Sequence, residues 1–288
     1  MKKTPNYGFP LNYLLLRIVI TTILIILSIG LFVIPHLQIV GIICLFTLPI
    51  IYSYFYVISF KQKFNRERKQ YLEKIINISC FKGHEMVLDL GTGSGFLAVN
   101  IAKKLKHGKV IGVDKYFKKK VPFIRFLKNF IKINYIFNTL YTANRNAMIE
   151  QVNNTCQFIN YDLEKPLPFN NNSFDIILVS EFFYCFPKQK QQQLLTEIHR
   201  TLKNNGQLII LETKNISLFE WDVKNIENYM NEREYLTQSF DYNDKIILQC
   251  KKTNPKNEPL KTQIPIPQEY TEAYATLDHA HNYNSVYH

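Results

Sequence analysis

Cysteine is scarce in this sequence, with five residues in 288, and no two of them lie close together. Cys44, Cys80, Cys156, Cys185 and Cys250 form no C-x-x-C pair and no cysteine–histidine spacing. This pattern argues against a disulfide framework and a zinc site, and it fits a reducing compartment. Acidic residues are also few: 23 Asp and Glu stand against 35 Lys and Arg, a formal charge of +12. The excess predicts an anionic neighbour: a membrane face, a nucleic acid or an acidic substrate.

Charged residues are almost absent from the first 60 positions, where only Lys2, Lys3 and Arg17 occur. The apolar runs at 11–34 and 37–60 each have about the 20 residues that a helix needs to cross a bilayer core of roughly 30 Å. Buried core helices rarely stay apolar on every face for so long. A cleaved signal peptide is disfavoured, because a second run follows at once and no A-x-A site closes the first. The sequence therefore predicts a membrane anchor over 1–60, with transmembrane helices at about 11–34 and 37–60.

The flanking charges predict the orientation of this hairpin. Lys2 and Lys3 precede the first run, a basic group over 61–69 follows the second, and the connecting turn has no Lys or Arg. Basic residues prefer the cytoplasmic side of a membrane. We therefore expect an integral membrane protein whose two termini, and whose domain after residue 60, are cytoplasmic.

The rest of the chain alternates between strand and helix patterns. We expect a helix at 62–79 and a soluble domain over 61–252. Strands are predicted at 86–90, 110–113, 156–160, 174–180 and 207–211, helices at 96–105 and 189–202, and a hairpin of strands at 235–240 and 245–250. Such alternation is typical of a doubly wound, mostly parallel α/β sheet, here with an antiparallel last strand. Residues 253–288 are polar and proline-rich, so we expect a disordered tail whose histidines are solvated and bind no metal.

A glycine-rich turn joins the first predicted strand to the next helix. Asp89 precedes Gly91-Thr92-Gly93-Ser94-Gly95, and backbone N–H groups at such a turn, with the positive end of the helix, attract anionic groups. A P-loop is excluded because no G-K-[ST] follows. The dinucleotide pattern G-x-G-x-x-G is not met either, since Phe96 occupies the position of its third glycine.

The sequence resembles the class I S-adenosylmethionine-dependent methyltransferases over about residues 70–250. The resemblance rests on blocks in the family's order. They are residues 87–95, Asp114 after the second strand, Tyr161-Asp162-Leu163-Glu164, Leu167-Pro168-Phe169 with Ser173-Phe174-Asp175, and residues 202–206. Residues 146–152 (NAMIEQV) further resemble a microbial subgroup with small-molecule or quinone-type substrates. The resemblance implies a seven-stranded Rossmann-like sheet and S-adenosylmethionine as the cofactor.

The resemblance also implies roles for particular residues. Gly91, Thr92, Gly93 and Gly95 would let the backbone approach the methionyl part of the cofactor. Asp89 would attract its ammonium group, and Asp114 would accept hydrogen bonds from its ribose hydroxyls. Asp162 would accept from the adenine amino group, with Leu163 beside the ring. Each of these acids also has a plain structural reading as a surface or capping residue.

No catalytic base is inherited from the family. The weak candidates after the fourth strand are Glu181 and Tyr184, and for each a core-packing role competes with catalysis. The related subgroup commonly has His-Glu where this chain has Cys185 and Phe186. The aromatic residues here favour an apolar substrate. The basic, aromatic stretch 116–137 fits either a helix at the membrane interface or a helix packed on the sheet.

These patterns predict a membrane-anchored methyltransferase (an EC 2.1.1 enzyme) that acts on an apolar or lipid-like small molecule at the cytoplasmic membrane face. Two alternatives stay open: a protein or peptide methyltransferase at the membrane, and a non-catalytic cofactor-binding scaffold. Nucleic acid is the least favoured substrate, because the N-P-P-Y tetrapeptide of amino-directed nucleobase methyltransferases is absent after the fourth strand. The acceptor atom and the oligomeric state are left open.

Overall fold

The computed structural model describes residues 4–7, 11–34, 36–116, 138–183, 186–214, 223–233, 235–242 and 244–253. The basic stretch over 117–137, Tyr184, Cys185 and the predicted tail from 254 lie outside the described residues. The sheet has seven strands in the order β3-β2-β1-β4-β5-β7-β6. By internal packing the chain forms two compact units: residues 1–85 with 91–161, and residues 86–90 with 162–288.

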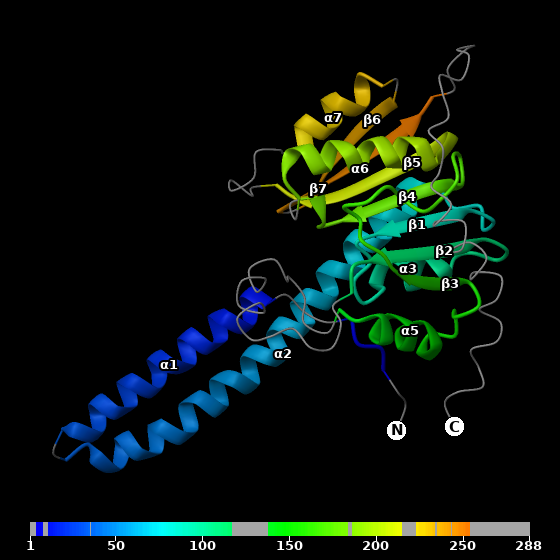
Figure 1. Ribbon diagram of the computed structural model, residues 1–288. Coiled ribbons are helices and arrows are strands. Elements are labelled where there is room, and N and C mark those ends of the chain that lie inside the picture. Colours follow the sequence, from blue (N-terminus) through cyan, green and yellow to red (C-terminus); the bar gives the residue numbers. More distant parts are fainter. Residues whose placement is uncertain are drawn as a thin grey trace. The chain divides into compact units, whose positions relative to one another are not determined.

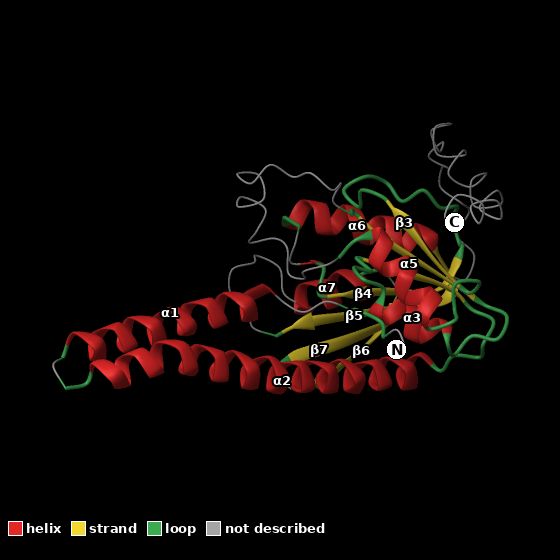
Figure 2. Ribbon diagram, turned by 90° about the horizontal axis from the view of Figure 1, so that it is seen from below, coloured by secondary structure: helices red, strands yellow, loops and turns green. Residues whose placement is uncertain are grey.

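The first unit begins with two long helices, α1 (Leu11–Val33) and α2 (Gln38–Ser79). They run antiparallel, side by side, as a hairpin (Figures 1 and 2). The predicted helices at 37–60 and 62–79 proved to be one continuous helix of 42 residues. From Lys61 onward the sequence is rich in charged residues, which suit water and not lipid. Charged side chains do not break the backbone hydrogen bonds of a helix, so the helix continues.

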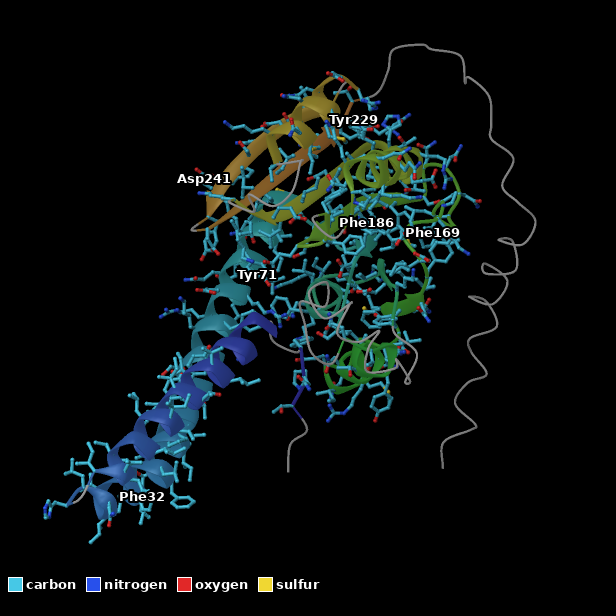
Figure 3. All side chains as sticks on the ribbon, turned by 60° about the vertical axis from the view of Figure 1, so that its left-hand side comes forward. Phe32, Tyr71, Phe169, Phe186, Tyr229 and Asp241 are labelled. Atoms are coloured by element: carbon cyan, nitrogen blue, oxygen red, sulfur yellow. The ribbon has the colours of Figure 1, made fainter. Side chains whose placement is uncertain are left out.

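The hairpin leaves its apolar side chains uncovered. Ile39 is 73% exposed and Val33 is 72% exposed. Figure 3 labels Phe32 near the turn of the hairpin, among side chains that point outward. Farther along α2, Tyr71, Leu72 and Ile75 are buried, so only this second part of the helix contributes to a packed core.

One stretch of the described chain, Gln38–Tyr56, is long and apolar enough to cross a membrane by length and composition, with a hydropathy of 1.9. The apolar stretch Ile18–Val33 in α1 is shorter. Because a core helix or a signal sequence passes the same test, the two-span membrane anchor stays a prediction.

The first unit also contains α3 (Phe96–Ala102), β2 (Lys109–Asp114), α5 (Leu140–Ile149) and β3 (Cys156–Asn160). β2 and β3 are parallel, with Gly112 opposite Phe158. Helix α3 packs on β2 and β3, α5 packs on β3, and α2 contacts α3. The predicted strands 110–113 and 156–160 are confirmed, whereas the helix expected at 96–105 ends at Ala102.

The second unit carries the other strands and two helices. They are β1 (Met86–Leu90), β4 (Phe174–Ser180), α6 (Lys188–Thr201), β5 (Leu202–Thr213), α7 (Val223–Asn231), β6 (Tyr235–Tyr242) and β7 (Lys245–Lys252). β1, β4 and β5 are parallel, and β7 is antiparallel to both β5 and β6. The structure thus confirms the mostly parallel sheet with an antiparallel last strand.

Asp175 holds the amino ends of these strands together. It accepts the Met86 N–H at 2.8 Å and pairs with the Lys203 ammonium at 2.9 Å. Asp175 therefore serves the packing of β1, β4 and β5.

Candidate cofactor site and acid cluster

The glycine turn of the first unit has a backbone that only glycine adopts readily. Gly91, Gly93 and Gly95 have φ angles of 73°, 55° and 81°. The N–H groups of Gly91 and Thr92 donate to the Val113 carbonyl at 2.8 and 3.1 Å, which fixes the turn to the end of β2. A side chain at these positive φ values is strained, so the sequence of the turn dictates its shape.

Close neighbours add a second reason for the glycines. A Cβ atom on Gly95 would lie 2.5 Å from the Phe158 ring, and one on Gly93 would lie 2.9 Å from Nδ2 of Asn138. One on Gly112 would lie 2.6 Å from Phe158 and 2.7 Å from Oγ1 of Thr92. The turn and the start of α3 can therefore sit close to β2 and β3 only because these positions lack side chains.

Asp114, at the end of β2, contacts the glycine turn directly. Its Oδ2 accepts the Gly93 N–H at 2.7 Å. Burial raises the pKa of its carboxyl to about 6, although the N–H groups of Gly93 and Lys115 oppose the shift. The Tyr116 hydroxyl donates to the Gly93 carbonyl at 3.0 Å, so the peptide groups of Gly93 are held on both sides.

The structure thus gathers five of the predicted cofactor residues around one turn: Gly91, Thr92, Gly93, Gly95 and Asp114. Asp89, Asp162 and Leu163 belong to the second unit. There Asp89 and Leu163 are buried, and Asp162 accepts the Glu164 N–H at 3.2 Å in a local turn. The cofactor roles given to all eight residues stay predictions.

A separate cluster of charged residues lies at the ends of β4, β5 and β7 within the second unit. Glu181 follows β4 with a φ of 49° and forms an ion pair with Lys245, the first residue of β7. Both side chains are largely buried, with exposed fractions of 16% and 14%. The Lys245 ammonium thus lies beside the largely buried Glu181 carboxylate and balances its charge.

Glu212, near the end of β5, binds the loop that follows β4. One of its oxygens accepts the N–H groups of Phe182 and Phe183 at 3.0 and 2.9 Å. Burial raises its pKa to about 7, and the charge of Glu181 adds to the shift, whereas the two N–H groups and Lys245 oppose it. The amide of Gln191 donates to the carbonyls of Phe183 and Phe186, both at 2.9 Å, so both sides of the loop are fixed.

Sequence reasoning missed Tyr116, Asn146, Glu212 and Lys245 as site residues. Glu212 leaves a local signal, because an acid directly after the apolar run of β5 has to be buried with partners. The contacts of the other three depend on residues far away in the sequence. Tyr184, the second catalytic candidate, lies outside the described residues.

Metal-binding chemistry finds no support in the part of the chain that is described, where no three His, Cys, Asp or Glu residues are placed to hold an ion. The four cysteines placed there, Cys44, Cys80, Cys156 and Cys250, are free thiols.

Comparison with known proteins decides the class of the fold. Residues 119–210, from before α5 into β5, match the family model described as a methyltransferase domain. The matched stretch, about a third of the chain, is similar to methyltransferase domains. The prediction of S-adenosylmethionine as its cofactor is confirmed by this match. No curated protein matches the sequence.

Solved structures resemble this chain in fold. The [4+2]-cyclase SpnF is 13% identical with a TM-score of 0.50, covering 64% of this chain and 81% of SpnF. The YcgJ protein of Bacillus subtilis is 15% identical with a TM-score of 0.49, covering 64% and 98%. Magnesium protoporphyrin IX methyltransferase of Synechocystis PCC 6803, solved with bound S-adenosylmethionine, is 13% identical with a TM-score of 0.49, covering 67% and 83%. At such identities a likeness concerns the fold alone.

Proposed function

We propose that this protein is a membrane-anchored methyltransferase that transfers the methyl group of S-adenosylmethionine to an apolar or lipid-like small molecule at the cytoplasmic membrane face. The observation that carries the cofactor part is the glycine turn held by Asp114 and Tyr116. The exposed apolar hairpin of α1 and α2 carries the membrane part.

The residues of the turn suit the cofactor. As the family resemblance implies, Gly91, Gly93 and Gly95, with their positive φ angles, would let the backbone approach the methionyl group, and the Asp114 carboxylate beside Gly93 would offer acceptors to two ribose hydroxyls. Asp89 would bind the ammonium group, and Asp162 with Leu163 would bind the adenine, as the family resemblance implies. When bound, the sulfonium supplies an already activated methyl group, so the protein chiefly orients the acceptor and excludes water.

Proton removal from an oxygen or carbon acceptor would need a base. Glu181 is held in an ion pair, whereas the pKa of Glu212 is raised to about 7 by burial, near the value at which a general base works best. We therefore add Glu212 as a second candidate proton acceptor, next to the predicted Glu181. Lys245 would retain the negative charge of Glu181.

Three features of the hairpin suit a lipid environment. The hydroxyls of Thr22, Ser28 and Thr47 donate to carbonyls four residues earlier, at 2.8 to 2.9 Å, which satisfies them within their own helices. Small residues allow close packing of the two helices: Ser28 is buried, and a Cβ on Gly41 would lie 2.6 Å from the Phe32 nitrogen. The exposed apolar side chains would contact lipid tails instead of water.

The test is methyl transfer from labelled S-adenosylmethionine in membranes that carry the full chain, with Asp114→Ala as the matched blank. Products are divided into lipid, protein and aqueous fractions. Lipid-soluble label that is absent from the blank supports the proposal. Label in protein would favour the peptide methyltransferase instead, and cofactor binding without any label would favour the non-catalytic scaffold.

A further inference from the structure

A short segment at the N-terminus, residues 4–7, is joined to the glycine turn by one buried side chain. The Asn6 N–H donates to Oδ1 of Asn146 at 2.8 Å, and Nδ2 of Asn146 donates back to the Asn6 carbonyl at 2.7 Å. The same Nδ2 donates to the Ser94 carbonyl, inside the turn, at 2.9 Å. Asn146 is 0% exposed, so its amide bridges two backbone segments that are far apart in the sequence.

Helix α2 contacts the same N-terminal segment through Arg68. Nη1 of Arg68 donates to the Tyr7 carbonyl at 2.9 Å. The Arg68 guanidinium lies 4.2 Å from the centre of the Phe64 ring and 5.0 Å from that of Phe96. A buried guanidinium is costly without such partners, so these contacts define its position.

Phe96 contacts both the N-terminal segment and helix α2, and it lies directly after the glycine turn. It is the first residue of α3 and directly follows Gly95. Its ring packs edge-to-face with Tyr7 at 5.2 Å and with Tyr71 of α2 at 6.2 Å. The chain before α1 and the packed part of α2 thus both contact the first residue of α3, the helix that follows the glycine turn.

We propose that the backbone of residue 6 supports the glycine turn from outside the cofactor site, and that Asn146 is a positioning residue, which couples the docking of the chain before α1 to the affinity for S-adenosylmethionine. The proposal rests on the proposed function, since it takes the glycine turn as the cofactor site. Asn146 touches the Ser94 carbonyl, so its loss frees a peptide group of the turn. Linkage then requires that bound cofactor strengthen the docking of residues 4–7 by the same factor.

The backbone character of the contact gives a matched pair of variants. Asn6 contacts Asn146 through its own N–H and C=O, so Asn6→Ala keeps both groups, whereas Asn6→Pro removes the N–H. We expect Asn6→Pro to weaken the binding of S-adenosylmethionine about five- to tenfold, on the order of one lost hydrogen bond. Asn6→Ala should bind like the unaltered chain.

A second variant acts from the other side of the bridge. Asn146→Asp keeps the size of the side chain but turns an oxygen toward the carbonyls of Asn6 and Ser94. We expect a loss of affinity on the order of tenfold or more, because two hydrogen bonds become repulsive contacts. The KM for S-adenosylmethionine should rise, and kcat at saturating cofactor should stay close to that of the unaltered chain.

The measurement is equilibrium binding of S-adenosylmethionine and S-adenosylhomocysteine to the full chain in detergent micelles, with circular dichroism to check the fold of each variant. Hydrogen exchange at the Asn6 amide gives a readout that is independent of activity. Added cofactor should slow it in the unaltered chain and in Asn6→Ala.

The outcomes separate this proposal from the proposed function. If the unaltered chain binds neither compound, the proposed function and the coupling both fail. If it binds them and Asn6→Pro binds equally well, only the coupling is overturned. Equal losses in Asn6→Ala and Asn6→Pro would also overturn it, because they would assign the effect to the side chain. If Asn146→Asp does not fold, the Asn6 pair still decides.

Discussion

At the scale of single residues, the cofactor turn depends on a few hydrogen bonds that converge on Gly93. Its N–H donates to Asp114 and its carbonyl accepts from Tyr116. Each such hydrogen bond contributes only modestly to the free energy of folding, but leaving a buried polar group without its partner lowers stability by more. Single-atom changes here should therefore alter cofactor affinity more than they alter the fold.

Cofactor affinity should depend on pH through Asp114. In the proposed site the ribose hydroxyls would donate to the ionised carboxylate; burial raises its pKa to about 6, so protonation below that pH would remove the acceptor. We expect the affinity for S-adenosylmethionine to be constant above about pH 7 and to fall as the pH drops through 6. Calorimetry between pH 5 and 8 measures this. Asp114→Asn should bind the cofactor more weakly, with an affinity that does not depend on pH. If the affinity of this variant still falls at acidic pH, Asp114 is not the group that causes the fall.

Removing the Tyr116 hydroxyl should weaken cofactor binding by on the order of 1 kcal/mol, the usual net value of one hydrogen bond. Tyr116→Phe keeps the buried ring and removes the hydroxyl that donates to the Gly93 carbonyl. The matched control is Tyr141→Phe, since Tyr141 is 77% exposed on α5. Binding titrations on both variants compare the two positions, and equal affinities would show that Tyr116 does not hold the turn.

At the scale of elements, the strands could be predicted from the sequence more completely than the helices. Apolar runs closed by turn residues located β1, β3 and β4 to the residue, because buried parallel strands need such runs. Helices α5 and α7 were not predicted. They are 10 and 9 residues long and bury only three residues each, so each offers few positions from which a helical period can be recognised.

Contacts between distant segments could not be predicted at all. The pairs Asn146–Asn6 and Glu181–Lys245 join residues 140 and 64 positions apart. No local periodicity records such pairs, because they arise only when the sheet and the helices have assembled. The sequence motif NAMIEQV marked Asn146 without indicating what its side chain binds.

The loop after β4 should become less stable as Glu212 ionises. The pKa of Glu212 is raised from 4.5 to about 7, so the folded state binds the proton more tightly than the unfolded state does. Its contribution to stability is full below pH 4.5 and is lost as the pH rises to about 7. The unfolding temperature of Glu212→Gln relative to the unaltered chain should therefore rise over this interval. A difference that is independent of pH would show that Glu212 does not titrate there.

The hairpin offers two glycines for comparison. A Cβ on Gly41 would lie 2.6 Å from the Phe32 nitrogen, whereas nothing lies within 4 Å of one on Gly30. Gly41→Leu should destabilise the packing of α1 on α2 by about 1–3 kcal/mol, and Gly30→Leu should not. Thermal unfolding of both variants in micelles distinguishes them. Equal stability would mean that the two helices do not pack closely at Gly41.

At the scale of the whole molecule, an α/β domain follows a helical hairpin that we propose to lie in the membrane. Many apolar side chains of α1 and of the first part of α2, between Ile18 and Ile58, are exposed in the described residues, and a bilayer would bury them. Alkaline carbonate should leave the full chain in the membrane pellet. Release into the supernatant would indicate surface attachment through the basic residues instead.

The proposed membrane anchor is the reason for the proposed substrate class. An acceptor that dissolves in the bilayer would be concentrated at the surface to which we propose that the enzyme is anchored, and this would raise the rate of encounter. SpnF, a cyclase of similar fold, shows that this fold alone does not fix a reaction. The chemistry of the acceptor therefore has to be measured.

The most direct test is the fractionated transfer of label from S-adenosylmethionine in membranes that carry the full chain or its Asp114→Ala variant. We predict labelled product in the lipid fraction with the unaltered chain and little with the variant. Label that appears only in protein, or none at all from a chain that binds the cofactor, would contradict a methyltransferase of apolar small molecules.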